Sequence, residues 1–463
     1  MEKAILDFID RLEISEVPMH AILLMQNGNL ITEGYYAPYK KDVPHRMFSI
    51  VKSLNALCIG ILEEEGRLKL SDKIVDYFPD KLPKEVHPFL AAMTIEDMLR
   101  MRSCHAQTTY KLSDMEWVES FFKTPPTHKP GTVFHYDTSA AHVLCMLVER
   151  VSGKPMFTYF REKIGDEIGW SKDAYLINND FGDPQGGSGL MCTPKDLLLL
   201  AKLLLQEGNW NGKQLLPKEY LKKATSNLTP NVVTGGVKSE RMGYGYQIWC
   251  GEHGSFVLYG MGGQLAICFP EFNFICVTCA DSQGMGGGNQ FIYNVLHETI
   301  LPALKEGKVL KGMTPAITRR MESLHIAPIC PENTCSETAK RIQDKCYTFA
   351  ENKHGFTKCH FSFEDSYEEG IFHYTYNGHD CVLPFSFTEC KEGVFPVYDL
   401  FCCTSGAWLE KNTLYLKSHI IDTSVGSVHM EFVFGEEDVT VFIKKIEETI
   451  LNEYNCHLYG ICN

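Results

Sequence analysis

The sequence predicts an α/β (α+β) protein, in which an antiparallel sheet flanked by helices carries a helical subdomain and is followed by a smaller all-β barrel or sandwich. Three observations predict this fold. Helix and strand patterns alternate at both ends of residues 1–305, helical patterns dominate the middle of that range, and short alternating strands fill residues 341–463. Apolar residues recur every 3.6 positions in a helix and every second position in a strand, which separates the two.

The first domain, residues 1–305, begins and ends with helices that flank strands. We expect an amphipathic helix at Glu2–Leu12 and alternating strands through His20–Tyr36, with a turn at Asn27-Gly28-Asn29. Two of the expected central helices end at glycines: Ala140–Val151 and Pro194–Leu205. Strand patterns return before a last helix at about 290–305, in Gly245–Trp249, Phe256–Leu258, Leu265–Phe269 and Phe274–Cys279. Both ends of this domain therefore close one sheet, with a helical insertion between them.

Residues 306–340 are expected to be a linker with some helix, because three prolines and mixed charge interrupt the periodicity. Beyond them, residues 341–463 predict a separate antiparallel domain, a lipocalin-like barrel or a sandwich. Asn377-Gly378 is a hairpin turn signal. The expected strands are Phe361–Phe363, Ile371–Tyr376, Val382–Phe387, Trp408–Leu416, Val428–Phe434 and Val439–Lys444.

The composition is that of a soluble globular protein. Of 463 residues, 44% are hydrophobic and 22% are charged, and the formal net charge is -14 with a pI near 5.7. No cluster of lysine and arginine reaches the density that phosphate binding needs, so we expect no nucleic-acid partner. No uncharged run of about 18 residues is present, so we expect no membrane partner.

The N-terminus and the cysteines predict a cytoplasmic protein. Residues 1–10 carry acids where a signal peptide has its apolar core. The 18 cysteines then indicate reduced thiols, since the cytosol rarely permits structural disulfides. The only C-x-x-C runs from Cys276 to Cys279 in a strand pattern, where positions i and i+3 face opposite ways. We therefore expect no metal and no cofactor.

A nucleophile is indicated by the segment Ser49-Ile50-Val51-Lys52. Side chains at i and i+3 share a helix face, so Lys52 can reach the hydroxyl of Ser49. A free lysine amine titrates near about 10.4, but burial or a cationic neighbour can bring it to roughly 7–8, where it serves as a base. The apolar helix that follows, up to Gly66, supplies burial, and its first turn points backbone N–H groups toward Ser49.

The same spacing occurs a second time, in Ser120-Phe121-Phe122-Lys123. This copy lies just before Thr124-Pro125-Pro126, where a helix must end. Its serine and lysine have no long buried helix to sit on, so we do not expect Ser120 to be catalytic.

Several segments, in this order, resemble the class C β-lactamase and penicillin-binding-protein family of serine hydrolases, whose first motif is S-x-x-K. The second motif of the family begins with a tyrosine, and Tyr136 falls at that place. The third is Lys-Thr-Gly or His-x-Gly, and residues 259–264 fall where it should lie. The similarity covers roughly residues 5 to 300 and is carried by Phe48–Ser53, Gly60–Lys73, Met93–Leu99, Pro130–Ser139, Gly187–Leu197 and Tyr259–Gln264.

The resemblance implies a β-lactamase-like fold for the first domain and an acyl-enzyme mechanism. Ser49 would attack a carbonyl, while Lys52 and Tyr136 would share the role of general base, helped by a lowered tyrosine pKa. The oxyanion would rest on the amides of Ser49 and of Gln264, with Gly262 and Gly263 allowing the backbone to come close.

Two departures from the family pattern narrow the substrate. Thr138 stands where antibiotic-hydrolysing members carry Asn, and Met261 stands where they carry Lys or His. The missing cation would otherwise grip the carboxylate of a β-lactam or peptide, so we expect neither a resistance β-lactamase nor a cell-wall peptidase. Tyr244, Tyr246 and Trp249 either line the pocket or belong to the strand core, and the sequence leaves both interpretations open.

The expected function is hydrolysis of a small intracellular ester or amide, as in carboxylesterases, amidases or D-aminopeptidase-like enzymes. Two alternatives remain open: an acyltransferase that uses the same acyl-enzyme, and a catalytically silent binding or sensor protein. For the C-terminal domain we expect structural support, with ligand binding, covering of the active-site mouth and homodimer contacts as further options.

Overall fold

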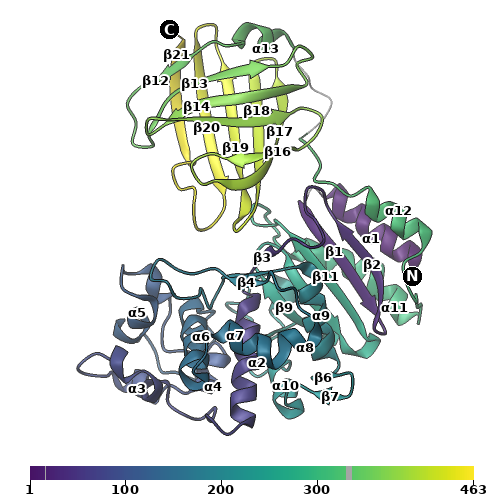
Figure 1. Ribbon diagram of the computed structural model, residues 1–463, viewed down its shortest axis with the longest axis vertical. Coiled ribbons are helices and arrows are strands. Elements are labelled where there is room, and N and C mark those ends of the chain that lie inside the picture. The colour runs from purple at the N-terminus through teal and green to yellow at the C-terminus, as the bar shows by residue number, and fades with distance from the viewer. Residues whose placement is uncertain (16, 330–335, 463) are drawn as a thin grey trace. The chain divides into compact units, whose positions relative to one another are not determined.

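The computed structural model of the protein describes residues 1–15, 17–329 and 336–462. The chain forms two compact units, one of residues 1–35 and 41–324 and the other of residues 36–40 and 325–463. Figure 1 labels the elements of both. None of the described helices is long and apolar enough to cross a membrane.

The first unit is built on a six-stranded antiparallel sheet in the order β2-β1-β11-β10-β9-β8. Every residue of β1 and β11 is buried, so both faces of the central sheet are covered. The N-terminal hairpin of β1 and β2 pairs, through β1 and β11, with the strands from the C-terminal part of the unit, as expected. The strands are β1 Met19–Gln26, β2 Asn29–Tyr35, β8 Trp249–Cys250, β9 Phe256–Gly260, β10 Gln264–Phe269 and β11 Phe274–Ala280.

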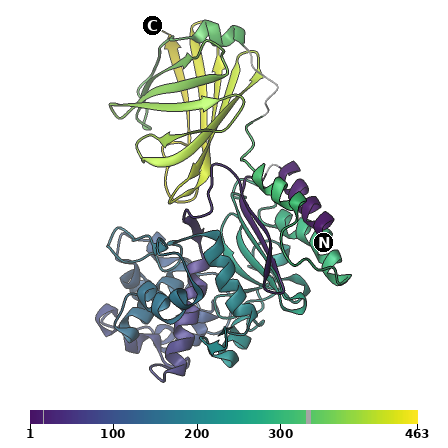
Figure 2. The same cartoon turned by 45° about the vertical axis from the view of Figure 1, so that its right-hand side comes forward.

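Helices from both ends of the unit cover one face of this sheet, and central helices cover the other (Figures 1 and 2). The first group holds α1 Glu2–Ile14, α11 Gln290–Lys305 and α12 Pro315–Glu322. On the other face lie α2 Ile50–Glu64 and α9 Pro194–Leu205. Packing is close, because a Cβ added at Gly34 of β2 would lie 2.4 Å from the sulfur of Met321 in α12. The expected helices at 2–12 and 194–205 are confirmed.

The helical subdomain is inserted between β2 and β8. Its longest helix, α6 Thr138–Ser152, ends at Gly153 with a left-handed φ of 74°, as the sequence predicts. The shorter helices are α3 Pro88–Ala92, α4 Ile95–Leu99, α5 Trp117–Lys123, α7 Met156–Phe160, α8 Asp166–Ile168 and α10 Lys218–Ala224. Small sheets add β3 His45–Phe48, β4 Tyr175–Leu176, β5 Leu190–Cys192, β6 Asn209–Trp210 and β7 Lys213–Gln214.

The expected strand Gly245–Trp249 is wrong for most of its length, because only Trp249 belongs to a strand. The preceding residues form a tight buried turn, in which the amide of Gly245 donates to the carbonyl of Ile248 and Gln247 has a φ of 55°. A Cβ at Gly245 would lie 2.0 Å from the carbonyl oxygen of Ala224. Apolar residues alternate in this segment because the turn is buried on all sides, and not because the chain forms a pleated strand.

The second unit is a closed nine-stranded barrel, not a sandwich. Strand β12 pairs with β21, and β15 meets β17 at Ser386 and Ser405, which closes the ring; β16 forms a hairpin with β17. Its elements are α13 Ser336–Ile342, β12 Tyr347–Phe349, β13 Phe356–Phe363, β14 Glu369–Tyr376, β15 His379–Ser386, β16 Lys391–Phe395, β17 Leu400–Glu410, β18 Thr413–Ile421, β19 Val425–Phe434, β20 Asp438–Ile446 and β21 Cys456–Cys462.

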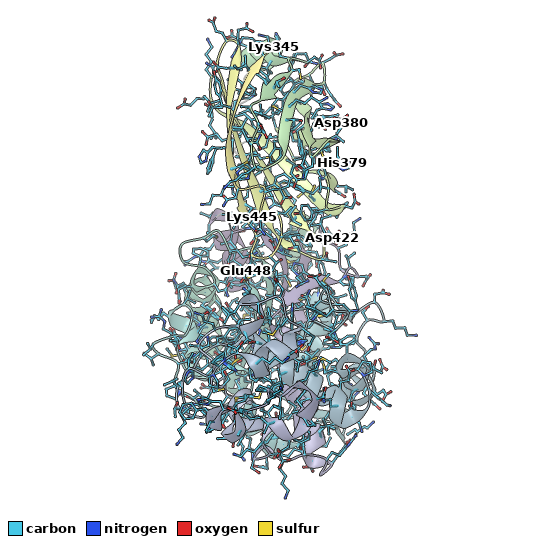
Figure 3. The ribbon with its side chains drawn as sticks, turned by 90° about the vertical axis from the view of Figure 1, so that its left-hand side faces the viewer. Lys345, His379, Asp380, Asp422, Lys445 and Glu448 are labelled. Atoms are coloured by element: carbon cyan, nitrogen blue, oxygen red, sulfur yellow. The ribbon has the colours of Figure 1, made fainter. Side chains whose placement is uncertain are left out.

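Aromatic side chains dominate the inside of this barrel. The ring of Phe361 lies 5.1 Å from that of Phe372 and 4.9 Å from that of Phe432, within one buried hydrophobic cluster. Charged side chains such as Asp380 and Glu448 lie on the outside (Figure 3). The expected single strand Trp408–Leu416 is wrong: residues 411 and 412 form a turn between β17 and β18. Apolar residues on both sides of that short turn hide it in the sequence pattern.

Candidate active site

Ser49 lies at a sharp junction between β3 and α2. Phe48 has a left-handed φ of 46°, which is uncommon for a bulky side chain and is held by the surrounding structure. Its strand is fixed by pairing with β5, where Phe48 faces Leu190. The helix begins at Ile50, directly after Ser49. Ser49 therefore sits at the N-terminus of α2, where unpaired backbone N–H groups can stabilise negative charge.

Lys52 occupies the next turn of α2 and is 1% exposed. Its Nζ donates to Ser49 Oγ over 2.9 Å and to the carbonyl oxygen of Gly187 over 2.5 Å. The contact expected from the i, i+3 spacing is present. The second contact, with a residue far along the chain, could not be read from that spacing.

Tyr136, the first residue of the second motif, lies beside the hydroxyl of Ser49. Its phenol interacts with the hydroxyl of Ser49 and with the indole of Trp249, and its ring centroid lies 4.8 Å from Lys52 Nζ. Burial raises the pKa of Tyr136 well above its usual value, and the charge of Glu240 adds to this, while the bonds to Ser49 and Trp249 oppose it. The expected lowering of this pKa is therefore wrong, because enclosure of the hydroxyl outweighs its hydrogen bonds. Tyr136 is a neutral phenol at neutral pH in this state.

A glycine turn at residues 185–189 joins the first two motifs. Asn55, one helical turn after Lys52, donates to the carbonyl oxygen of Gly186 over 2.7 Å. A Cβ at Gly187 would lie 2.4 Å from Thr138 Cγ2 and 2.8 Å from the Thr138 carbonyl oxygen. The predicted residue Thr138 thus packs against the turn that accepts the hydrogen bond of Lys52. Asn55 was missed in the sequence, where it has the appearance of an ordinary core position of the helix.

The third motif forms the turn between β9 and β10. Gly262 and Gly263 have φ values of 80° and 100°, which favour glycine, and Met261 is the side chain at the start of the turn. A Cβ at Gly260 would lie 2.3 Å from the carbonyl oxygen of Met47, so the end of β9 runs directly beside the segment that carries Ser49. The predicted oxyanion hole, formed by the amides of Ser49 and Gln264, requires these two backbone segments to lie close together.

The side chain of Gln264 is committed to the protein itself. Its Nε2 donates to the carbonyl oxygens of Met261 and Ala280 over 2.6 and 2.9 Å, and its Oε1 accepts from the amide of Ala280 over 3.0 Å. Gln264 is fully buried. Its side chain therefore fixes the turn, and the role of its backbone amide in an oxyanion hole stays a prediction.

Of the three aromatic candidates, two adjoin the site and one does not. The rings of Tyr244 and Trp249 lie 6.4 and 5.3 Å from that of Tyr136. The hydroxyl of Tyr246 instead donates to Glu96 over 2.7 Å, in the helical subdomain. Phe134 packs on both Tyr244 and Trp249 and was not among the predicted residues.

Glu240 is a buried acid beside the site that the sequence did not single out. It is 3% exposed, and its carboxylate accepts from Asn289 Nδ2 over 3.2 Å and from the amide of Val237 over 3.1 Å. Burial raises its pKa to about 7, although both hydrogen bonds oppose the shift. Its ionisation near neutral pH changes the electrostatic environment of Tyr136.

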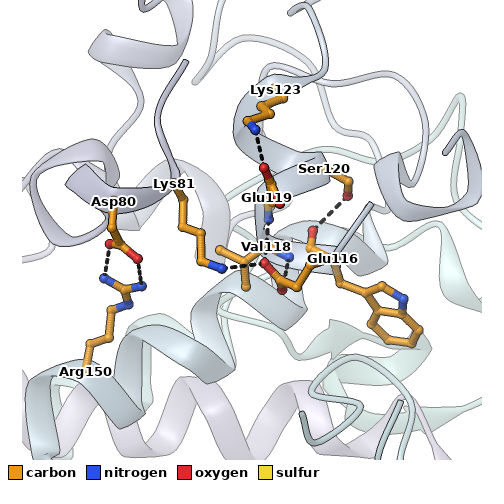
Figure 4. Close-up of polar contacts among 9 residues, drawn as sticks. Asp80, Lys81, Glu116, Val118, Glu119, Ser120, Lys123 and Arg150 are labelled. Atoms are coloured by element: carbon orange, nitrogen blue, oxygen red, sulfur yellow. Dashed lines mark hydrogen bonds and ion pairs between the residues drawn. The ribbon is translucent and has the colours of Figure 1, made fainter. Parts of the chain in front are cut away.

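The second S-x-x-K copy does not form a catalytic pair. Ser120 is buried, and its hydroxyl donates to the carbonyl oxygen of Trp117 over 2.8 Å and lies 3.0 Å from Thr109 Oγ1. Lys123 pairs with Glu119 on the surface of the same helix (Figure 4).

We predict that Gly187→Ala slows labelling of Ser49 by a fluorophosphonate by about 10²-fold, because the added methyl group pushes the turn from Thr138 and removes the carbonyl that holds Lys52. The rate of labelling is measured by stopping the reaction at a series of times and determining the labelled fraction by intact-mass spectrometry. Gly312→Ala is the matched control, since a Cβ there meets nothing within 4 Å. Equal rates for both variants would contradict the role given to the turn.

We predict that Glu240→Gln stabilises the protein more at pH 8 than at pH 5. The folded-state pKa of Glu240 lies above its usual 4.5, so the folded protein holds this proton longer and loses stability as pH rises toward about 7. At about 1.4 kcal/mol per pKa unit, the difference between variant and parent in the free energy of unfolding should shift by about 2–3 kcal/mol between the two pH values. Urea unfolding at pH 5 and 8 measures it.

Glu448→Gln serves as the control for this experiment, because Glu448 is exposed on the barrel. A Glu240→Gln variant whose effect on the free energy of unfolding is the same at pH 5 and at pH 8 would disprove the burial of a protonated carboxyl at this position.

Comparison with known proteins places this geometry in a family. The sequence profile described as Beta-lactamase matches residues 9–288. A 6-aminohexanoate-dimer hydrolase of Paenarthrobacter ureafaciens is 24% identical over 297 residues, which are 58% of this chain and 74% of that protein.

Two solved structures share the fold. A D-amino acid amidase from Ochrobactrum anthropi has a TM-score of 0.53 and 19% identity, over 67% of this chain and 100% of that one. An octameric penicillin-binding protein homologue from Pyrococcus abyssi has a TM-score of 0.50 and 17% identity, over 99% of both chains. With the profile spanning more than half of its length, the chain belongs to the β-lactamase and penicillin-binding-protein-like family of serine hydrolases.

Proposed function

We propose that the protein forms an acyl-enzyme on Ser49 and cleaves an ester or amide bond of a small molecule. One observation carries this proposal: the hydroxyl of Ser49 accepts a hydrogen bond from Lys52 and interacts with the phenol of Tyr136, at the N-terminus of a buried helix. A hydroxyl held between two groups that can exchange a proton is the arrangement that nucleophilic catalysis needs.

The proposed proton path follows from these contacts. Burial disfavours the charged form of an amine, and a neutral amine beside Ser49 can accept the proton of its hydroxyl as the Ser49–carbonyl bond forms. Tyr136, a neutral phenol, can then protonate the departing alcohol or amine and be reprotonated by the ammonium group of Lys52, which returns that amine to its neutral form. Water attacks the acyl-enzyme in the second half, with the same groups acting in reverse.

The surroundings of Tyr136 support an uncharged acyl group. Tyr244, Trp249 and Phe134 form an aromatic cluster beside Tyr136, and Met261 stands in the third motif where antibiotic-hydrolysing members of the family carry Lys or His. A substrate carboxylate would lack the charged partner that a Lys or His supplies. Relatives described as a 6-aminohexanoate-dimer hydrolase and a D-amino acid amidase favour an amide as the bond to test first.

We also propose a cytoplasmic location, where the substrate would be an intracellular metabolite. In the described part of the chain every cysteine is a free thiol, and most are buried. Such cysteine usage is typical of a reducing compartment. Fractionation of the native cells with an antibody to the full chain tests the location.

We predict that a fluorophosphonate adds one phosphonyl group to the protein and that Ser49→Ala abolishes the adduct. Tyr136→Phe should slow labelling by about 10²–10⁴-fold, the usual contribution of a general acid or base. Intact-mass spectrometry reads the adduct. Ser120→Ala is the matched control, since Ser120 has the same local motif without the pairing, and it should label like the parent. Equal labelling of Ser49→Ala would favour a catalytically silent protein.

We predict that hydrolysis dominates over acyl transfer when p-nitrophenyl esters and amino-acid amides are offered together with an alcohol or amine acceptor. Chromatography of the products gives the ratio of acid to transfer product. An excess of transfer product at millimolar acceptor would support the acyltransferase alternative instead.

A further inference from the structure

Three side chains converge at a place that the proposed reaction does not use. Glu252 and His253 lie in the short turn between β8 and β9, and His297 lies on α11. One ligand atom from each lies within 4.8 Å of the others. Glu252 Oε2 is 3.6 Å from His297 Nδ1 and 3.9 Å from His253 Nε2.

These distances suit a shared cation better than direct contacts. They are too long for hydrogen bonds. In a tetrahedral zinc site with bonds of about 2.0–2.2 Å, neighbouring ligand atoms lie roughly 3.3–3.6 Å apart. The distance from Glu252 to His297 already fits this spacing, and the distance from Glu252 to His253 exceeds it by a few tenths of an ångström. The two imidazole nitrogens, which lie within 4.8 Å of each other, would move closer together on binding. Two imidazoles and one carboxylate are also a ligand set that zinc uses in proteins.

Two other polar atoms of these side chains lack hydrogen bonds. Glu252 Oε1 and His297 Nε2 are buried and make no hydrogen bond among the described residues, although Lys238 Nζ lies 3.5 Å from Glu252 Oε1. Buried polar atoms without partners are uncommon in native proteins and call for an explanation. A bound cation would neutralise the carboxylate and order both rings, which now meet edge to face with centroids 4.8 Å apart.

The charges around the cluster permit cation binding. The competing cation is Lys238, whose Nζ lies 3.5 Å from Glu252 Oε1. Its side chain is 80% exposed and can turn into solvent when a metal ion binds.

A second cluster, of Glu116, His142 and Asp183, is less suited. The Glu116 carboxylate already caps α5, accepting from the amides of residues 118 and 119, and it pairs with Lys81 over 2.8 Å (Figure 4). A metal ion there would have to displace these partners.

We propose that Glu252, His253 and His297 bind a divalent cation of the zinc type, which ties the turn between β8 and β9 to α11. Three protein ligands leave a fourth position for water. Trp249, whose ring centroid lies 5.3 Å from that of Tyr136, is three residues before Glu252. The cation would brace the edge of the sheet beside the active site and take no part in the reaction.

Isothermal titration of the full chain with ZnCl₂, after treatment with a chelator, tests this proposal. We expect binding of about one ion per chain, with affinity reduced by at least about 10-fold in His297→Ala and in His253→Ala. Zinc should also raise the melting temperature of the parent but not of these variants. His253 is partly exposed, so its variant remains informative if His297→Ala does not fold.

His373→Ala is the matched control, because His373 stacks on His360 in the barrel and offers another pair of imidazoles. It should bind zinc like the parent. Cobalt(II) distinguishes ligand types, since nitrogen and oxygen ligands give visible bands without the near-ultraviolet charge transfer of thiolates. No binding at 100 μM zinc, unchanged affinity in both cluster variants, or thiolate charge transfer would each overturn the proposal. Labelling of Ser49 by the fluorophosphonate reports separately on the proposed reaction.

Discussion

The buried amine of Lys52 is the constraint on which the active site depends. An amine that is 1% exposed must have its polar contacts supplied by the protein, and these come from Ser49 and from the carbonyl of Gly187. One contact is local to α2, and the other fixes a distant turn against it. The position of the nucleophile and the packing of the helical subdomain are therefore parts of one arrangement.

Glycines make this arrangement possible at two places. The turn that holds Lys52 lies against Thr138, and the end of β9 lies against the backbone of Met47; in both, a side-chain carbon at the glycine would be under 2.5 Å from its neighbour. The first approach lets a backbone carbonyl accept the hydrogen bond of Lys52. A main-chain group holds that position without a cost in side-chain entropy.

The two units differ in their relation to the proposed reaction. Every residue of the proposed reaction belongs to the first unit, whose sheet is covered on both faces. The barrel has its own aromatic core and closes its edges by strand pairing, which removes exposed strand edges. Structural support and homodimer contacts remain predictions for this domain.

Local relationships were determined by the sequence itself. The Ser49–Lys52 contact follows from the geometry of one helical turn, and α9 begins and ends as expected because Pro194 starts it after a Thr193–Asp196 capping box. Features that depend on distant neighbours were decided only by the tertiary structure. These include the Gly187 carbonyl on Lys52, the raised pKa of Tyr136, and the meeting of His297 with Glu252. Burial and long-range approach set all three, and neither is encoded in the spacing of residues along the chain.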